Sequence, residues 1–251
     1  AGLNSGVEAI GEFQGHLYFA TQNGLYVLDS GSINKIEGLE KDCYGVRSIQ
    51  FDNDTLLFIA EANEVVSLSG QGDLNVVEKG GPYDFLVSPL DSTELIVLHW
   101  DGLSKLKYKE GKFEEVRYLN DVGGASPFNF LIDPDGTMWI GSLYEEVYGV
   151  FKGHVNMFEE DNPTFQNDSA DEGLPQGASF LFRYANDLYV GNDLGLFKLI
   201  DGKFKLTSDF GIDFTKNEYG VHRINSDPDG NVWMIIFDKE NNYQYGFSSK
   251  T

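Results

Sequence analysis

Three of the four arginines in this chain lie where their side chains could hold a ligand. Arg47, Arg183 and Arg223 each fall in a short, largely apolar segment of similar character. A planar guanidinium binds carboxylates and sugar hydroxyls directionally, so arginines that recur in this way favour an anionic or polyhydroxylated ligand. The alternative is that each arginine forms an internal ion pair or lies in a solvated wall. The sequence leaves both interpretations open.

Two further polar residues belong with these arginines. Arg47, Asn129 and Arg223 each stand ten residues before an apolar or aromatic marker residue, which is Leu57, Trp139 or Trp233. The shared offset predicts equivalent positions for the three, and His222 adjoins Arg223. The candidate ligand-binding residues are therefore Arg47, Asn129, Arg183, His222 and Arg223.

Other chemistry has little support in the sequence. The four histidines are scattered without metal-ligand spacing, and Cys43 lies in no local nucleophile motif. The turns that contain Asp-x-Asp could suggest calcium, but no acidic residue closes such a loop at the required position. We therefore expect no cofactor, no metal and no catalytic residue, with the aspartates acting in turns.

The net charge and the composition limit the classes of molecule that the chain could bind. The 251 residues carry a net charge of −22, which repels phosphate backbones and anionic lipids, so we expect no nucleic acid and no membrane insertion. Aromatic residues make up 14% of the chain and favour packed strands. The single cysteine fits either a reducing or an oxidising compartment. The chain begins at Ala1, which suggests a processed or trimmed start.

A repeat positions all of these residues. The marker recurs every 39 to 50 residues, and around it each repeat shows up to four short apolar segments separated by turn residues; the markers are Tyr18, Leu57, Ile96, Trp139, Tyr189 and Trp233. Such segments are strands joined as hairpins, and four strands per 40 to 50 residues are typical of propeller blades. The predicted fold is an all-β propeller of about six blades, mostly of four antiparallel strands, with very little helix. First strands of such blades line a central channel.

We expect a single domain over residues 1–251. Its approximate blades are 6–45, 46–84, 85–126, 127–178, 179–220 and 221–251. The last blade has about three strands, and it is either incomplete or closed by a strand from residues 1–5. An acidic insertion at 158–179 interrupts the fourth repeat, and residues 166–178 within it are a candidate lid.

The clearest repeated motif is Asp-Pro-Asp-Gly with a Trp three residues after the glycine, at Asp133–Trp139 and Asp227–Trp233. The two residues between the glycine and the tryptophan differ between the copies. Proline fixes φ, aspartate accepts hydrogen bonds from backbone NH groups, and glycine adopts positive φ, so the motif turns the first strand into the second. Both tryptophans should then pack between neighbouring blades.

These residues resemble the two-component regulator propeller repeat. The similarity is carried by "DPDGTMWIGS" at 133–142, "DPDGNVW" at 227–233, "YVGNDLGLFKL" at 189–199 and "EGLPQGAS" at 172–179, while the second and third repeats match poorly. The resemblance implies the extracytoplasmic sensor portion of a bacterial signalling protein, often one that senses carbohydrate.

The resulting expectation is a non-enzymatic, ligand-binding sensor propeller located in the periplasm or outside the cell. Its partners would be a small molecule or oligosaccharide and a signalling output domain or protein. One alternative is a scaffold propeller that binds other proteins. A weaker alternative is a metal-dependent propeller hydrolase or lyase, because a propeller fold does not by itself determine function.

Overall fold

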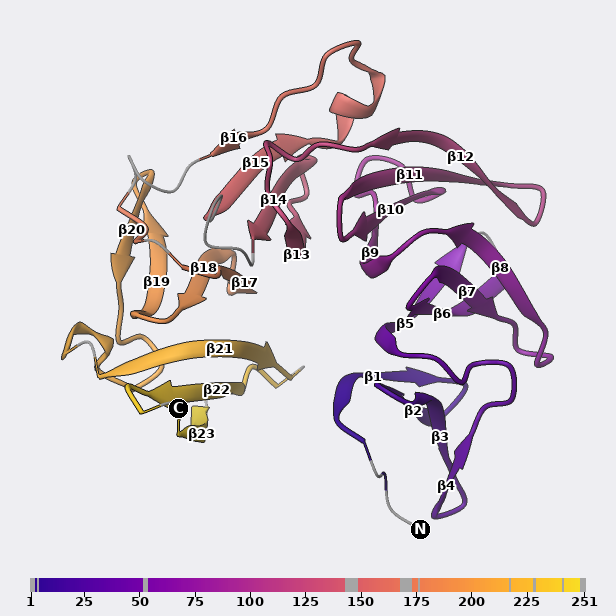
Figure 1. Ribbon diagram of the computed structural model, residues 1–251, viewed down its shortest axis with the longest axis horizontal. Helices are drawn as coiled ribbons and strands as arrows, with labels where there is room; N and C mark the ends of the chain where they lie inside the picture. The colour runs from indigo at the N-terminus through magenta and orange to yellow at the C-terminus, as the bar shows by residue number, and fades with distance from the viewer. Residues whose placement is uncertain are drawn as a thin grey trace. The chain divides into compact units, whose positions relative to one another are not determined.

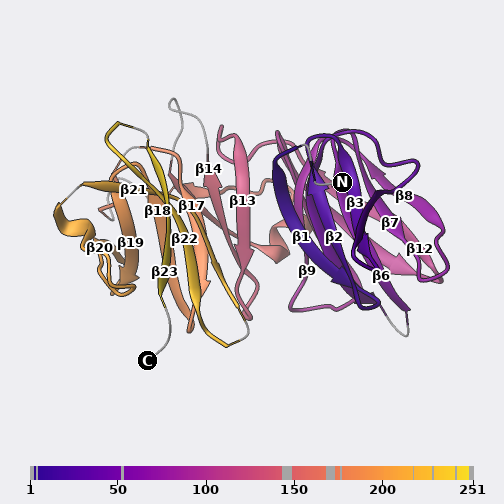
Figure 2. The ribbon, with the colours of Figure 1, turned by 90° about the horizontal axis from the view of Figure 1, so that it is seen from below.

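The computed structural model describes most of the chain. The described residues are 3, 5–51, 54–142, 149–167, 173–175, 177–216, 218–227, 229–240 and 242–248. They form six antiparallel sheets with two short 3-10 helices, and the sheets are the blades of an all-β propeller (Figures 1 and 2). Contacts divide the chain into two compact units, and each is described separately below.

The first unit contains blades one to three. Each blade is a four-stranded meander in chain order. The strands are β1 (Val7–Phe13), β2 (His16–Thr21), β3 (Gly24–Asp29) and β4 (Ser32–Lys35) in blade one; β5 (Cys43–Phe51), β6 (Asp54–Glu61), β7 (Glu64–Leu68) and β8 (Leu74–Lys79) in blade two; and β9 (Pro82–Val87), β10 (Glu94–His99), β11 (Gly102–Lys109) and β12 (Lys112–Leu119) in blade three.

The second unit contains blades four to six. Blades four and five have four strands, and blade six has three among the described residues. The strands are β13 (Pro127–Ile132), β14 (Thr137–Ser142), β15 (Val150–His154) and β16 (Gln166–Asn167); β17 (Phe180–Tyr184), β18 (Asp187–Asn192), β19 (Gly195–Ile200) and β20 (Lys203–Leu206); and β21 (Tyr219–Ser226), β22 (Val232–Asp238) and β23 (Tyr243–Ser248). The helices are η1 (Val155–Glu159), whose last two residues, Phe158 and Glu159, belong to the first unit, and η2 (Phe214–Lys216).

Tight turns explain why the short apolar segments pair as hairpins. Five hairpins place two successive residues at positive φ, and four of the five pairs end in glycine; the pairs are Gln14–Gly15, Ser30–Gly31, Glu110–Gly111, Ala185–Asn186 and Asp201–Gly202. Two such residues form a type I′ turn, whose twist matches that of the flanking strands. Local turn chemistry therefore pairs successive strands in blades one, three and five.

The two Asp-Pro-Asp-Gly turns form as predicted at the residues that are described. Gly136 and Gly230 have φ of 90° and 84°, a region that favours glycine. Asp227 accepts a hydrogen bond at Oδ1 from the backbone NH of Asn231 at 2.8 Å, and another at Oδ2 from the Asn231 amide at 2.7 Å. Pro228, like Asp52 and Asn53 of the looser third copy, lies outside the described residues.

Neighbouring blades share their cores within each unit. Tyr18 and Leu25 of blade one pack with Leu57 and Ile59 of blade two, and comparable clusters join blades two and three, four and five, and five and six. Burying a large apolar side chain contributes about 1.5 to 3 kcal/mol, so these clusters hold successive sheets together. Cys43 is fully buried in the first cluster, and this burial raises the pKa of its thiol to about 12.

The two repeated tryptophans differ sharply in environment. Trp139 is 6% exposed and packs with Leu181 and Leu188 of blade five, as predicted. Trp233 occupies the matching place in blade six and is 53% exposed. The prediction that both would be packed between blades is confirmed for Trp139, and for Trp233 it stays a prediction.

Three first strands begin before the blade boundaries predicted from the sequence. β5 starts at Cys43, β9 at Pro82 and β21 at Tyr219, whereas the boundaries were placed at 46, 85 and 221. Most of the segment 1–5, proposed as a closing strand, lies outside the described residues. Within the described part of the chain, no helix is long and apolar enough to cross a membrane.

Candidate functional site

Arg47 lies on β5 and forms an ion pair with the next blade. Its Nη2 is 3.4 Å from Oδ1 of Asp84 on β9, and the arginine side chain is half exposed. The same carboxylate oxygen accepts a hydrogen bond from the backbone NH of Phe85 at 2.8 Å. This arrangement matches the alternative of an internal ion pair, since the guanidinium already contacts a carboxylate.

Arg183 makes the corresponding connection in the second unit. It lies on β17 and is ion-paired with Asp133, the first residue of the Asp-Pro-Asp-Gly turn of blade four. Asp133 also accepts a hydrogen bond from Nε1 of Trp139 at 2.8 Å, and Arg183 donates a second bond to the carbonyl of Asn186 at 3.0 Å. One turn aspartate therefore positions both the tryptophan of its own blade and the arginine of the next.

Asn129 links the same two blades through an uncharged contact. Its Nδ2 on β13 donates to the carbonyl of Leu181 on β17 at 3.1 Å. Its Oδ1 is buried and has no hydrogen-bond partner among the residues that the structure describes. A Cβ on Gly141 would lie 2.4 Å from this oxygen, so the glycine leaves room for the amide.

The predicted equivalence of Arg47, Asn129 and Arg223 holds for only two of them. Asn129 pairs with Gly141 and Arg223 with Ile235, each two residues after the tryptophan of its blade. Arg47 pairs with Phe58, and the residue that corresponds to the tryptophans is Phe58, not Leu57. Arg47 therefore lies further along its strand than Asn129 and Arg223 do along theirs, and it pairs with the residue at the tryptophan position, Phe58.

His222 is exposed in the middle of β21, and aromatic rings of two strands flank it. Its ring centroid lies 4.8 Å from that of Phe180 on β17 and 6.0 Å from that of Tyr243 on β23. Phe180 in turn meets Phe128 on β13 edge to face at 5.5 Å. We call Phe128, Phe180 and His222 the ring row; it follows the first strands of all three blades in the second unit.

Irregular pairing places two of these three rings, Phe128 and His222. The register between first and second strands shifts by one residue in five blades, which leaves Glu8, Tyr44, Tyr83, Phe128 and His222 as the extra residues. A bulge of this kind changes the direction of a side chain. Tyr44 and Tyr83 form a similar ring contact in the first unit, at 5.5 Å.

Sequence reasoning found His222 but missed the other rings. A signal was available, because an aromatic residue or histidine stands near the start of five first strands, in "CYGV", "PYDF", "PFNF", "SFLF" and "VHRI". The periodicity of the repeat predicted strands at these places, and alternation alone would have assigned the rings to the core. A bulge cannot be read from alternation, so the half-buried positions of Tyr44, Tyr83 and Phe128 were not predicted.

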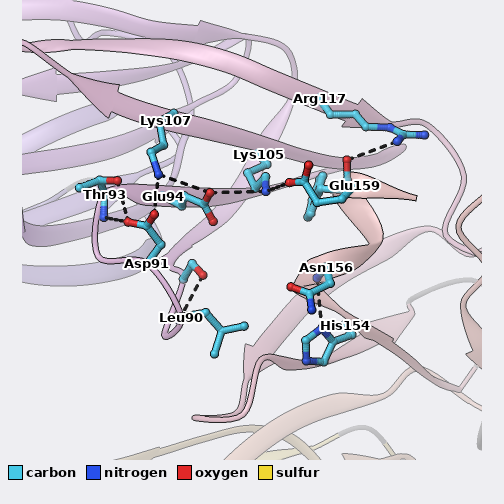
Figure 3. Close-up of polar contacts among 12 residues, drawn as sticks. Leu90, Asp91, Thr93, Glu94, Lys105, Lys107, Arg117, His154, Asn156 and Glu159 are labelled. Carbon is cyan, nitrogen blue, oxygen red and sulfur yellow. Dashed lines mark hydrogen bonds and ion pairs between the residues drawn. The ribbon is translucent and has the colours of Figure 1, made fainter. Parts of the chain in front are cut away.

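A network of ion pairs in the first unit stabilises blade three (Figure 3). Lys105 on β11 is 5% exposed, and its Nζ contacts Glu159 and lies 3.5 Å from Glu94. Lys107 lies 2.5 Å from Asp91 and 3.6 Å from Glu94. The hydrogen bond from Lys107 lowers the pKa of Asp91 well below its ordinary value. Because a buried ammonium requires a partner, we interpret this network as structural.

A buried serine, histidine and glutamate come together between blades two and three. Nε2 of His99 lies 3.0 Å from Oγ of Ser104 and 3.2 Å from Oε2 of Glu78, and the serine hydroxyl donates to the same carboxylate at 2.8 Å. In a catalytic triad the serine and the carboxylate contact opposite nitrogens of the imidazole. Here both contact Nε2 and the group is buried, so it lacks the geometry of a triad.

Metal binding has no cluster to support it. Among the described residues, no group of three histidine, cysteine, aspartate or glutamate side chains is arranged to hold an ion. The aspartates of the repeated turns instead bind Asn231, Trp139 and Arg183. Of the candidate lid at 166–178, only 166–167, 173–175 and 177–178 are described, and Gln166–Asn167 form the outer strand of blade four.

Comparisons with known proteins show the fold. No family model and no curated protein matches the chain. The extracellular domain of a one-component system from B. thetaiotaomicron matches over 100% of this chain and 35% of its own, at 15% identity and a TM-score of 0.65. A second structure of that domain, described as part of a hybrid two-component system, matches at 16% identity over 96% of this chain and 33% of its own, with a TM-score of 0.63.

A different class of protein shares the same architecture. Virginiamycin B lyase from Staphylococcus aureus, in a catalytically inactive form with quinupristin, matches at 11% identity and a TM-score of 0.58, over 96% of this chain and 85% of its own. This chain spans about a third of the length of the extracellular domains. At these identities the likeness shows the β-propeller fold and does not assign an activity.

Proposed function

We propose that this chain is the ligand-binding part of an extracytoplasmic sensor and recognises a polar small molecule, of which a carbohydrate is the leading class. The fold is similar to that of extracellular domains of bacterial signalling proteins, and this likeness supports a location in the periplasm or outside the cell. The chain would act as a binding module rather than an enzyme.

The observation that carries the proposal is the exposed imidazole of His222 beside the ring of Phe180. An aromatic face next to a group that donates and accepts hydrogen bonds suits a sugar, which presents C–H faces and hydroxyls together. Arg223 follows His222 in the chain and is the cation that we assign to the same site. Arg47 and Arg183 contribute differently, because each holds a carboxylate of a neighbouring blade.

Thermal unfolding in the presence of monosaccharides, oligosaccharides and sugar acids tests this proposal. A ligand at 100 times its Kd adds about 2.7 kcal/mol to the free energy of unfolding, which raises the midpoint clearly. We expect a saturable shift with at least one compound and its loss in His222→Ala. The matched control is His16→Ala, which removes an exposed histidine from blade one, in the other unit.

Two results would contradict the proposal. If no compound shifts the midpoint, the scaffold alternative gains, and a pull-down of protein partners becomes the next measurement. If a compound shifts the midpoint equally in the wild type and in His222→Ala, the ligand binds elsewhere. Elemental analysis of the purified protein separately tests the alternative of a metal-dependent enzyme, which requires stoichiometric metal.

A further inference from the structure

A lysine on the third strand lies near an aromatic ring in blades three, four and five. In blades four and five the ring is the marker of the same blade. Nζ of Lys152 lies 5.0 Å from the ring centroid of Trp139, and Nζ of Lys198 lies 5.4 Å from that of Tyr189. Each lysine is also the cross-strand partner of that marker. An ammonium over an aromatic face is attracted by the ring, so this contact is part of the repeat.

Blade three has the lysine without a ring of its own. Lys105 pairs with Ile96, the marker of blade three, which is aliphatic. The ring near Nζ of Lys105 belongs instead to Phe158 of η1, and its centroid is 5.7 Å away. Phe158 is 2% exposed. A residue of the insertion thus takes the place that a marker ring has in blades four and five.

The residue after Phe158 supplies a carboxylate to the same lysine. Nζ of Lys105 lies 3.5 Å from Glu94 of its own blade and contacts Glu159 (Figure 3). The Lys105 side chain is buried, and a buried ammonium requires such a partner. The hydrogen bond from Lys105 lowers the pKa of Glu159 below its ordinary value, so this carboxylate is ionised at neutral pH. The contact fastens a segment of the insertion as well as stabilising blade three.

Arg117 adds a third contact from the neighbouring strand. It lies opposite Lys105 on β12, and its Nη1 donates to the carbonyl of Phe158 at 3.3 Å. Residues 155–160, all of which the structure describes, make no backbone-to-backbone hydrogen bond with the strands of blade three. Side chains of blade three therefore hold the ring, the carbonyl and the carboxylate of two consecutive residues, as a receptor holds a peptide.

The held segment is a short excursion of the chain. Phe158–Glu160 belong to the first unit, whereas the chain before them, to Met157, and after them, from Asp161, belongs to the second. β15 ends at His154 and β16 begins at Gln166, so the segment lies between strands. Its release from Lys105 and Arg117 would break no strand pairing within a blade.

We propose that Lys105 and Arg117 form a docking site on blade three for a peptide in which an aromatic residue precedes an acidic one, and that Phe158–Glu159 occupies this site as an intramolecular ligand. The partner is a protein that presents the same two kinds of side chain in an exposed segment and displaces the chain's own residues. A tethered ligand competes at an effective concentration of roughly millimolar, so the partner must overcome this competition. The proposal concerns residues other than those of the small-molecule site and does not rest on it.

Fluorescence anisotropy with a labelled peptide of residues 154–162 tests the proposal on the full chain. The double variant Phe158→Ala/Glu159→Gln vacates the site, and we expect it to bind the peptide at least about tenfold more tightly than the wild type does, because the internal competitor is lost. Adding Lys105→Met to that variant should abolish binding. A second peptide, which keeps only the Phe-Glu pair in a glycine-serine sequence, should also bind and so separate recognition of the pair from recognition of its flanks.

The controls separate a lost contact from a lost fold. Lys198→Met, added to the double variant, removes the matched lysine of blade five and should leave the affinity for the peptide unchanged. Glu159→Gln alone changes a side chain that is 65% exposed, so it should raise the affinity in the same direction even if Phe158→Ala does not fold. The proposal is overturned if the peptide binds neither vacated variant, or if Lys105→Met leaves its affinity unchanged.

Discussion

The two Asp-Pro-Asp-Gly-x-x-Trp segments have nearly the same sequence and different surroundings. In blade four, Asp133 binds the indole of Trp139 and the guanidinium of Arg183, and the tryptophan is buried under blade five. In blade six, Asp227 binds Asn231 within its own turn, and Trp233 is half exposed. The turn is a local structure, while the role of its tryptophan depends on what lies against the sheet.

The comparison shows which features of a repeat depend only on residues that are close in the sequence. Both turns are completed by short-range hydrogen bonds and a glycine at positive φ, so each forms whatever its neighbours are. The stability that the tryptophan contributes comes from burial, which requires a following blade. Substitutions at matched positions should therefore have large effects in blade four and small effects in blade six.

The largest difference is expected for the tryptophans themselves. Trp139→Ala leaves a cavity in the core of blades four and five and should lower the free energy of unfolding by about 3 to 5 kcal/mol. Trp233→Ala should cost less than about 1 kcal/mol in the monomer, as for other exposed positions. Urea unfolding of both variants measures the difference, and equal losses would show that blade six is covered in solution.

The next difference concerns the residues two places after each tryptophan. A Cβ on Gly141 would lie 2.1 Å from the carbonyl oxygen of Ser179, so Gly141→Ala should destabilise the protein by about 1 to 3 kcal/mol. Ile235 occupies the matching position and already carries a large side chain. Ile235→Ala should thus have the smaller effect on the thermal midpoint, and the reverse order would contradict the assigned register.

The first aspartates of the two motifs should differ less. Asp133→Ala removes an ion pair and a hydrogen bond between partly buried groups, which should cost about 2 kcal/mol. Asp227→Ala removes hydrogen bonds within one turn and no ion pair to another blade, so it should cost less. Asp133→Asn is the informative companion in urea unfolding, because its amide oxygen can still accept from Trp139 while the charge opposite Arg183 is lost.

The smallest effect is a pH dependence of the turn in blade six. Hydrogen bonds from Asn231 lower the pKa of Asp227 below its ordinary value. A lowered pKa in the folded state means that the carboxylate stabilises the fold above the ordinary value of 3.8, and that this contribution is lost as the pH falls through the folded pKa. An NMR titration of the carboxyl carbon should show this lowered value, and Asn231→Ala should return it toward the ordinary one.

The sequence was sufficient to predict the blades because their determinants are local. Turn residues at fixed offsets and alternating apolar residues specify hairpins without knowledge of distant contacts. The assignment failed by one residue in blade two, where Leu57 and Phe58 are both fully buried. A strand buried on both sides gives no alternation, so its register could not be read, and the predicted equivalence of Arg47 with Asn129 failed for that reason.

The contacts of the candidate site could not be predicted in the same way. Asp84 lies 37 residues from Arg47, and Asp133 lies 50 residues from Arg183, so each pairing depends on how one blade packs on the next. Phe128 and His222 of the ring row lie at bulges, which change the direction of a side chain without a clear sequence signal. Residue type identified the groups capable of binding, and tertiary packing decides which of them are engaged.

Burial of Cys43 has a practical consequence for future experiments. The thiolate is the reactive form of cysteine, and a thiol whose pKa is about 12 is almost entirely protonated at neutral pH. Maleimide reagents should therefore leave the native protein unmodified. A cysteine introduced at an exposed position of either unit could then be labelled selectively in the natural background, and fluorescent or spin labels in both units would report the distance between them.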